Sequence, residues 1–439
     1  MARQGHPYCL APVSVAFAAV SLVCGALADV PGLPREGSQN GSHAGFLGLL
    51  EGHTGAIYAL ATSPDGWLAS GARDRQVALW SISSAIAPRK RKPHRRLEGH
   101  GAGVTALAFA GSGLLITGGA DNTTRIWDIA SGDHQVLPHP KTVFGIAVRG
   151  RDAVSFNSTV SGTVQAEGEF ATACWDGVVR IFGLPDALLK AELRGHTGGL
   201  YALTYSPLDG FLLASAGADR TVRIWDLRTM EVLWIMRAHG DHVTTVDWSP
   251  TEPFTLATGG WDRKFRLWQI GPEEVEACRG RGDCSQITAP RALGRHPQLV
   301  WRVSFAPGGH LVAACHGAVG QSPTVVIYEV ATGTVVRRLG RHKDTPLAIT
   351  WSADGSILAS AGMDKRVMLY DGHGTGDDLP QGDLDDDEEK QSWIADLLEY
   401  SAGGNRSDSS QNRSQDEGSA TGPGAQWFPH PLGVRAAFF

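Results

Sequence analysis

Histidine, a serine or threonine, and aspartate recur together along this chain, and hydrolytic enzymes use this combination to activate a nucleophile. His53, Ser70 and Asp74 form the first set, and an aromatic residue, Trp80, follows six positions after the aspartate. The same order occurs seven times in all, with losses in three of the copies. We call each set of four residues a tetrad.

Four of the tetrads are complete. They are His53, Ser70, Asp74 and Trp80; His100, Thr117, Asp121 and Trp127; His196, Ser215, Asp219 and Trp225; and His239, Thr258, Asp262 and Trp268. Two others keep the polar residues but end on Phe or Tyr: His139, Thr172, Asp176 and Phe182, and His342, Ser360, Asp364 and Tyr370. The last, with His296 and Tyr328, has Ala313 and Gly317 at the hydroxyl and carboxylate positions.

The tetrad spacing predicts a hydrogen-bond chain rather than a catalytic triad. The carboxylate can accept from turn amides and from the imidazole, the imidazole can reach the hydroxyl, and the hydroxyl can reach the indole. Leaving such buried groups unpaired would cost about 1 to 3 kcal/mol each, so the tetrads are expected to stabilise the fold. We predict no catalytic residue. No cofactor or metal is expected either, since the sequence has no Gly-rich phosphate loop followed by Lys and Ser or Thr, and no Cys pairs at zinc spacing.

The elements that must position the tetrads follow from the length of the repeat. A unit of about 40 residues is typical of a four-stranded antiparallel blade, which cannot bury both faces alone, so blades stack radially until the ring closes. In this pattern the chain resembles the WD-repeat family over residues 45–372. The resemblance implies an all-β, seven-bladed propeller that binds proteins or peptides without catalysing a reaction. An outer strand at residues 45–50 is expected to complete the last blade and close the ring.

One end of the predicted propeller carries the tetrad His and Asp residues, because the connections between blades and the second turn of each blade lie at the same end. We call it the tetrad end. Aromatic residues, Arg and Met are typical of interface hot spots, and we predict a partner-binding face there. Its residues are Tyr58, Arg73, Phe144, Trp175, Tyr201, Trp261, Trp301 and Met363. The alternative is that some of these rings pack sideways between neighbouring blades.

The predicted function is a non-enzymatic scaffold for protein-protein interactions through this aromatic-rich end. The alternative is cargo recognition, because the stretch 204–250, with Tyr205-Ser206-Pro207 and Asp247-Trp248-Ser249, is similar to the receptor for N-terminal peroxisomal targeting signals. A net charge of −6 disfavours nucleic-acid binding. The basic run Arg89–Arg96 at the opposite end predicts either a contact with an acidic partner or a solvated loop.

The cysteines do not decide the compartment. Cys174 and Cys315 lie near predicted strand ends and are expected as buried thiols, whereas Cys278 and Cys284 lie close enough in an inserted loop to pair as a disulfide.

The two ends of the chain differ from the repeats. Residues 1–28 have the layout of a secretory signal peptide, and the uncharged run 9–28 could instead stay as a membrane anchor. Either predicts the secretory pathway or a membrane location, and the alternative is the cytoplasm, since most eukaryotic WD-repeat proteins are intracellular. Residues 29–44 are expected to be a linker. Residues 373–439 are acidic and polar, and predict a largely disordered tail with a short amphipathic helix near 391–400.

Overall fold

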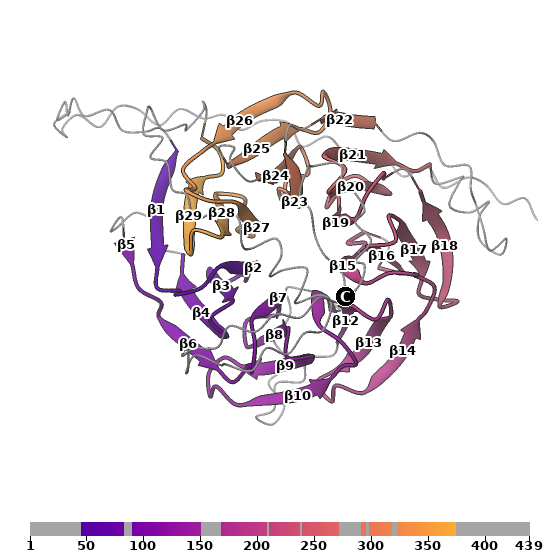
Figure 1. Cartoon of the computed structure of the whole chain (residues 1–439), viewed down its shortest axis with the longest axis horizontal. Coiled ribbons are helices and arrows are strands. Elements are labelled where there is room, and N and C mark those ends of the chain that lie inside the picture. Colours follow the sequence, from indigo (N-terminus) through magenta and orange to yellow (C-terminus); the bar gives the residue numbers. More distant parts are fainter. Residues whose placement is uncertain are drawn as a thin grey trace, which may run out of the picture. The chain divides into compact units, whose positions relative to one another are not determined.

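The computed structural model describes residues 45–82, 90–150, 168–208, 210–237, 239–271, 291–295, 298–317 and 323–374. Within these residues seven sheets, antiparallel except for one short parallel pair, form a closed ring, shown face-on in Figure 1. The predicted all-β, seven-bladed propeller is therefore confirmed. The predicted leader, the linker, the acidic tail with its helix, and the Cys278 and Cys284 pair lie outside the described residues.

Six blades have four strands, a to d, from the inside of the ring to its rim, and blade 7 has a fifth strand beyond strand d. Blade 1 contains β2 (Ile57–Thr62), β3 (Trp67–Ala72), β4 (Gln76–Ser81) and β6 (Arg95–Glu98). Blade 2 contains β7 (Val104–Ala110), β8 (Leu114–Gly119), β9 (Thr123–Asp128) and β10 (His134–Pro138). Blade 3 contains β11 (Val143–Gly150), β12 (Gly168–Cys174), β13 (Val179–Leu184) and β14 (Leu189–Leu193). Blade 4 contains β15 (Leu200–Tyr205), β16 (Leu212–Gly217), β17 (Val222–Asp226) and β18 (Glu231–Met236).

The remaining three blades complete the ring. Blade 5 contains β19 (Val243–Trp248), β20 (Thr255–Gly260), β21 (Lys264–Gln269) and β22 (Arg291–Arg295). Blade 6 contains β23 (Leu299–Phe305), β24 (Leu311–Gly317), β25 (Thr324–Glu329) and β26 (Val335–Leu339). Blade 7 contains β27 (Pro346–Trp351), β28 (Ile357–Gly362) and β29 (Arg366–Asp371), followed by β1 (Phe46–Glu51) and β5 (Lys90–Arg91).

The first strand of the propeller closes the ring, as the sequence predicted. β1 runs antiparallel to β29, with Leu50 opposite Val367, and so becomes the outer strand of blade 7. A further strand was not expected. The basic run Arg89–Arg96 was placed in a loop, but β5 pairs in parallel with β1, and Arg95 and Arg96 begin β6, the outer strand of blade 1. The run is therefore partly built into two sheets.

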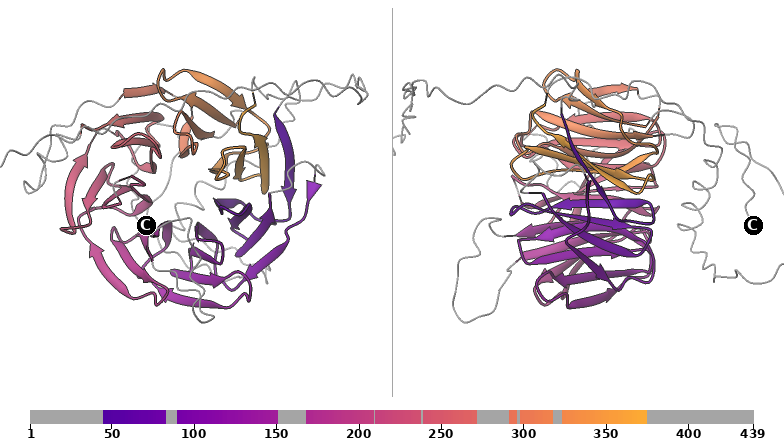
Figure 2. Two further views of the ribbon diagram at one scale, coloured as in Figure 1. Left: turned by 180° about the vertical axis from the view of Figure 1, so that it is seen from behind. Right: turned by 90° about the vertical axis from the view of Figure 1, so that its left-hand side faces the viewer.

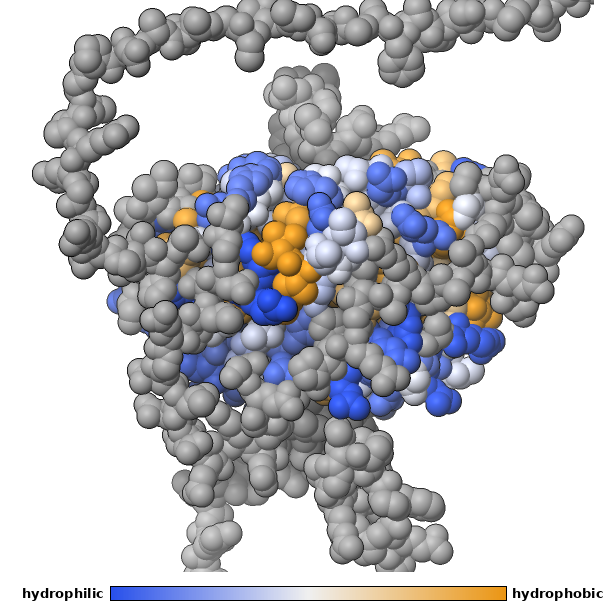
Figure 3. Space-filling view, turned by 90° about the horizontal axis from the view of Figure 1, so that it is seen from above, coloured by the Kyte–Doolittle hydropathy of each residue, from blue (hydrophilic) through white to orange (hydrophobic). Residues whose placement is uncertain are grey.

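Burial follows the position of each strand in its blade. Every residue of β16, β20 and β28 is buried, because neighbouring blades cover both faces of a middle strand. The outer strand β10 is mostly exposed. Figure 3 looks onto the rim, where hydrophilic residues surround a small hydrophobic patch. The apolar residues thus lie between blades.

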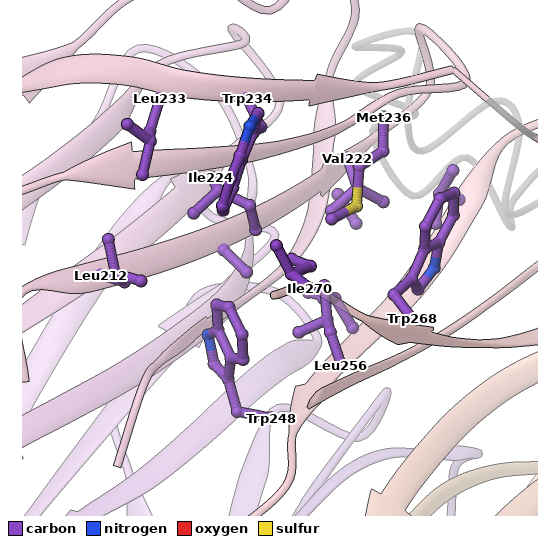
Figure 4. Packing of buried hydrophobic residues seen from close by; sticks show 14 of the residues in the cluster. Leu212, Val222, Ile224, Leu233, Trp234, Met236, Trp248, Leu256, Trp268 and Ile270 are labelled. Carbon is purple, nitrogen blue, oxygen red and sulfur yellow. The ribbon is translucent and has the colours of Figure 1, made fainter. Parts of the chain in front are cut away.

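The core is divided into clusters, one between each pair of neighbouring blades. Between blades 4 and 5, Trp234, Trp248 and Trp268 pack with Leu212 and Leu256, and all five are at most 3% exposed (Figure 4). Burying a large apolar side chain contributes about 1.5 to 3 kcal/mol before the entropy of ordering it is counted. Since each cluster needs both of its blades, a single blade is not expected to be stable alone.

The strands run across the thickness of the ring, as the side view in Figure 2 shows, so that their turns gather at its two ends. One of these ends carries the tetrad His and Asp residues.

Candidate partner-binding end

The first tetrad forms a continuous hydrogen-bond chain. His53 Nδ1 lies 2.9 Å from Asp74 Oδ2, and His53 Nε2 lies 2.8 Å from Ser70 Oγ. Because Asp74 only accepts, Nδ1 donates and Nε2 accepts from the Ser70 hydroxyl. The same hydroxyl oxygen accepts from Trp80 Nε1 at 2.8 Å. Ser70 is 0% exposed, so no substrate can reach it without opening the blade.

The other complete tetrads share this geometry. The His Nδ1 to Asp distance is 2.9 Å for His100 and Asp121, 2.8 Å for His196 and Asp219, and 3.1 Å for His239 and Asp262. The His Nε2 to hydroxyl distance is 2.7 Å for Thr117 and 2.8 Å for both Ser215 and Thr258. The indole nitrogens of Trp127, Trp225 and Trp268 donate to these hydroxyls at 2.8 to 2.9 Å. His342, Asp364 and Ser360 repeat the first two contacts in blade 7.

The environment keeps the tetrad carboxylates ionised. Burial raises the pKa of Asp74, but hydrogen bonds from His53 and from the amides of Thr54 and Gln76 outweigh it and hold the pKa at about 2. The same balance holds the pKa of Asp121 at about 2. In blade 4, burial lowers the pKa of His196 and so favours the neutral imidazole, which can donate to Asp219 and still accept from Ser215.

Blade 3 departs from the predicted tetrad. His139 Nε2 lies 2.9 Å from Thr124 Oγ1 of blade 2, instead of contacting Thr172 of its own blade. Asp176 binds Arg180 at 2.7 Å rather than the imidazole. Among the described residues, the Thr172 hydroxyl has no hydrogen-bond partner. Burial and the nearby Arg180 charge lower the pKa of His139 to about 4. The spacing alone was misleading here, because Arg180 takes the carboxylate.

In blade 6 the hydroxyl position of the tetrad lies one residue later than the sequence spacing predicts. Tyr328 pairs with Val312 as Trp80 pairs with Leu68, which places Ala314, not Ala313, at the hydroxyl position. Gly317 pairs with Leu299 and precedes the carboxylate position, which falls at 318, outside the described residues. The turn after β24 is longer than in the other blades, so the spacing between tetrad residues differs in blade 6.

Seven bulges present side chains at the tetrad end. In every blade the pairing of strands a and b shifts by one residue near the start of strand a. A bulge redirects a side chain and bends its strand. The skipped residues are Tyr58, Thr105, Phe144, Tyr201, Thr244, Trp301 and Leu347. Four of the predicted partner-binding residues are therefore bulge residues.

The structure brings five of the predicted face residues into one row with a histidine. We call Phe144, Trp175, Tyr201, His242, Trp261 and Trp301 the aromatic row. Neighbouring ring centroids are 5.4, 5.1, 5.9, 4.6 and 6.0 Å apart in that order, and the row crosses blades 3 to 6. All six rings are half-buried. Some of the ring contacts lie within a blade and others cross between neighbouring blades, and each ring keeps part of its surface in solvent.

The other three predicted residues, Tyr58, Arg73 and Met363, lie on blades 1 and 7, outside the row. His242 was missed by sequence analysis. Its Nδ1 lies 3.2 Å from the Tyr201 hydroxyl, and its ring stacks on Trp261 at 4.6 Å. The available signal was its position three residues after His239, where the other blades have no ionisable side chain.

The basic run at the opposite end is largely engaged by the propeller. Arg95 donates to the carbonyls of Ile129, Ala130 and Ser131 in blade 2. Arg96 donates to the Gly52 carbonyl at 2.6 Å, and Arg91 to the Ser81 carbonyl at 3.1 Å. Lys92 remains exposed.

The part of the chain that the structure describes contains neither a cluster of metal ligands nor a membrane-spanning helix. No group of three His, Cys, Asp or Glu residues there could hold a metal ion. Nor does any helix there have the length and apolarity needed to cross a membrane. Cys174 and Cys315 are buried free thiols, as expected.

Comparisons with known proteins agree with the repeat structure. The family model described as WD domain, G-beta repeat matches residues 45–81, 91–128, 188–226, 230–269 and 333–371. The chain is similar to Coronin-7 of Bos taurus, with 30% identity over 97 residues, or 22% of this chain and 10% of that protein. It is 31% identical to Protein HIR1 of Phaeosphaeria nodorum over 83 residues, which are 19% of this chain and 8% of the relative.

A third relative is the Intraflagellar transport protein 122 homolog of Danio rerio, with 29% identity over 73 residues, or 17% of this chain and 6% of that protein. The chain thus spans a tenth or less of the length of each of these relatives.

Proposed function

We propose that this chain, which belongs to the WD-repeat family, is a non-enzymatic scaffold that holds protein partners at the tetrad end of its propeller. A WD-repeat propeller is typical of protein-interaction scaffolds. The aromatic row is the observation that supports the tetrad end as the contact surface. Six half-buried rings there cross four blades on a rigid frame. Aromatic residues that are already ordered lose little entropy on binding.

The tetrads support a scaffold rather than an enzyme. Each complete tetrad has the groups of a hydrolytic triad, but its hydroxyl is fully buried and also accepts from an indole nitrogen. A nucleophile must be within reach of its substrate. These residues are thus expected to hold the blades together.

Three variants test the proposed contact surface. Trp261→Ala and Trp301→Ala remove rings of the aromatic row, and Trp67→Ala is the matched control, because Trp67 is half-buried at the opposite end of blade 1 and packs on His94. Proximity labelling and pull-down with the full chain should lose partners in the first two variants and keep them in the third. A loss of about 2 kcal/mol in binding is expected for each ring.

Thermal unfolding separates binding from folding. Partners that are retained equally by all three variants, when each variant is folded, would contradict the proposed surface.

The remaining proposals concern compartment and a second contact. We propose that residues 1–28 direct the chain to the secretory pathway or anchor it in a membrane. An acidic partner at residues 89–96 also stays a prediction, and it now depends mainly on Lys92, because three of the arginines donate to the propeller itself.

A further inference from the structure

Arg302 is an unusual residue for its place in the fold. It lies on β23, directly after the bulge residue Trp301, and pairs with Cys315. The residues at the same register in the other blades are all small: Ala59, Ala106, Gly145, Ala202, Thr245 and Ala348. Arg302 is thus the one cation among the seven residues at this register of the innermost strands.

The Arg302 guanidinium makes neither a hydrogen bond nor an ion pair within the described part of the chain, where the ionisable groups that act on it are Asp247 and Cys315. Its side chain is only partly exposed. Burial lowers the pKa of Arg302, which means that the protein holds this charge at a cost, and nearby Asp247 offsets only part of it. A guanidinium presents five donors in a planar fork that suits carboxylates.

Asp247 acts on the Arg302 charge without forming an ion pair with it. It lies on β19 of blade 5, and its Oδ2 accepts from the amide of Phe305 at 2.9 Å, which ties β19 to β23. Its effect on Arg302 is through space. An anion bound at Arg302 could therefore accept hydrogen bonds from the guanidinium. The negative charge of Asp247 nearby would oppose that binding.

The exposed charges around the tetrad end are mostly positive. In four blades the residue after the tetrad carboxylate is basic and exposed: Arg75, Arg220, Arg263 and Lys365. Their φ values of 59 to 70° lie in a region that favours Gly or Asn, so the backbone does not require a basic residue there. The tetrad carboxylates face inward and are paired with His. Asp241 and Asp344 each accept from the amide of the following residue.

We infer that the tetrad end takes an acidic peptide segment, with one carboxylate on Arg302 and apolar or aromatic side chains on the aromatic row. The inference rests on the proposed function and names the chemistry of its partner. The exposed cations would raise the rate of encounter with such a segment, and this contribution is screened by salt. Arg302 would provide the directional contact, which salt weakens less.

The test uses the full chain and a short fluorescein-labelled peptide that alternates Glu with Leu and Phe. Its neutral analogue has Gln in place of every Glu. Fluorescence anisotropy should show tighter binding of the acidic peptide. Arg302→Gln should weaken that binding about 10- to 100-fold, as expected for the loss of a charge-assisted hydrogen bond. Binding of the neutral analogue should hardly change.

Two further variants and a control refine the test. Arg263→Gln should weaken binding only about two- to fivefold, and this loss should fade at about 0.5 M salt. Asp247→Asn should strengthen binding, because it removes the competing charge. Arg338→Gln, an exposed change on the outer strand β26, should have no effect. Thermal unfolding confirms that each variant is folded.

The inference is overturned if wild-type protein binds the acidic peptide no tighter than the neutral one, or if Arg302→Gln binds it as wild type does. These results leave the proposed function intact when cellular partners still depend on Trp261 and Trp301. Conversely, cellular partners that bind the Trp261→Ala and Trp301→Ala variants as well as wild type contradict the proposed function itself, whatever the peptide measurements show.

Discussion

Removing the Asp219 carboxylate should destabilise the propeller measurably. Asp219 accepts four hydrogen bonds: from His196 Nδ1 at 2.8 Å, the Thr197 amide at 3.1 Å, and the amide and hydroxyl of Thr221 at 3.1 and 2.8 Å. In Asp219→Ala, Thr197 can turn to water because it is exposed, and the Thr221 hydroxyl can rotate. The His196 side chain is 0% exposed and loses its short contact from Nδ1, which leaves the more distant Thr221 hydroxyl at 3.4 Å.

The expected cost is about 2 to 3 kcal/mol, since each buried donor left unpaired costs about 1 to 3 kcal/mol; the Thr221 amide is buried and loses its acceptor, and His196 Nδ1 keeps only a distant one. Thermal unfolding followed by circular dichroism measures it. Asp354→Ala is the matched control, because this exposed carboxylate also accepts from local donors, Ser352 Oγ and the Ser356 amide, which water can replace. Its melting temperature should stay close to wild type. Equal melting temperatures for Asp219→Ala and Asp354→Ala would refute the structural role of the tetrad carboxylate.

Three other predictions concern a titrating group, a ring and the leader. Burial raises the pKa of Asp247 to about 6, so its charged form is disfavoured in the folded state and stability should fall as pH rises through 6. The loss of stability spans the range from the ordinary Asp pKa to the raised one, so Asp247→Asn should exceed wild type by up to about 3 kcal/mol at pH 8 and approach it only below about pH 4 in thermal unfolding; a pH-independent difference would contradict this. Trp261→Phe should keep wild-type stability, because the Trp261 Nε1 is buried without an acceptor among the described residues; a drop of more than about 1 kcal/mol on thermal unfolding would show an unseen partner. A C-terminally tagged chain made in eukaryotic cells should begin near Asp29 if the leader is cleaved, and N-terminal sequencing that finds Met1 in a cytosolic fraction would reject export.

The sequence predicts the ring because the spacing of the tetrad residues recurs along the chain. Seven copies of one spacing define seven blades, and a count of five from each tetrad histidine finds every bulge residue, Tyr58 and Trp301 included. Counting fails where a turn changes length, so in blade 6 the spacing predicts Ala313 at the hydroxyl position, whereas the strand pairing places Ala314 there.

Contacts between blades are harder to predict than contacts within them. His139 binds Thr124 of the neighbouring blade, and no spacing within blade 3 points to that residue. The pairing of β5 with β1 involves backbone atoms of only two residues, Lys90 and Arg91, whose side chains carry no strand pattern. His242 belongs to the aromatic row, but no repeat signal points to it, because the equivalent position in the other blades has no ionisable side chain.

The pairing of β1 with β29 has a consequence for how the protein is made. On a ribosome, the residues of β1 emerge early, but their partner strand is among the last of the propeller to leave the exit tunnel. At about 5 to 20 residues per second, β1 waits on the order of tens of seconds. During that time it presents an unpaired edge that other chains can join. A nascent chain that stalls before β29 is therefore expected to need chaperone protection, even though every earlier blade has been synthesised.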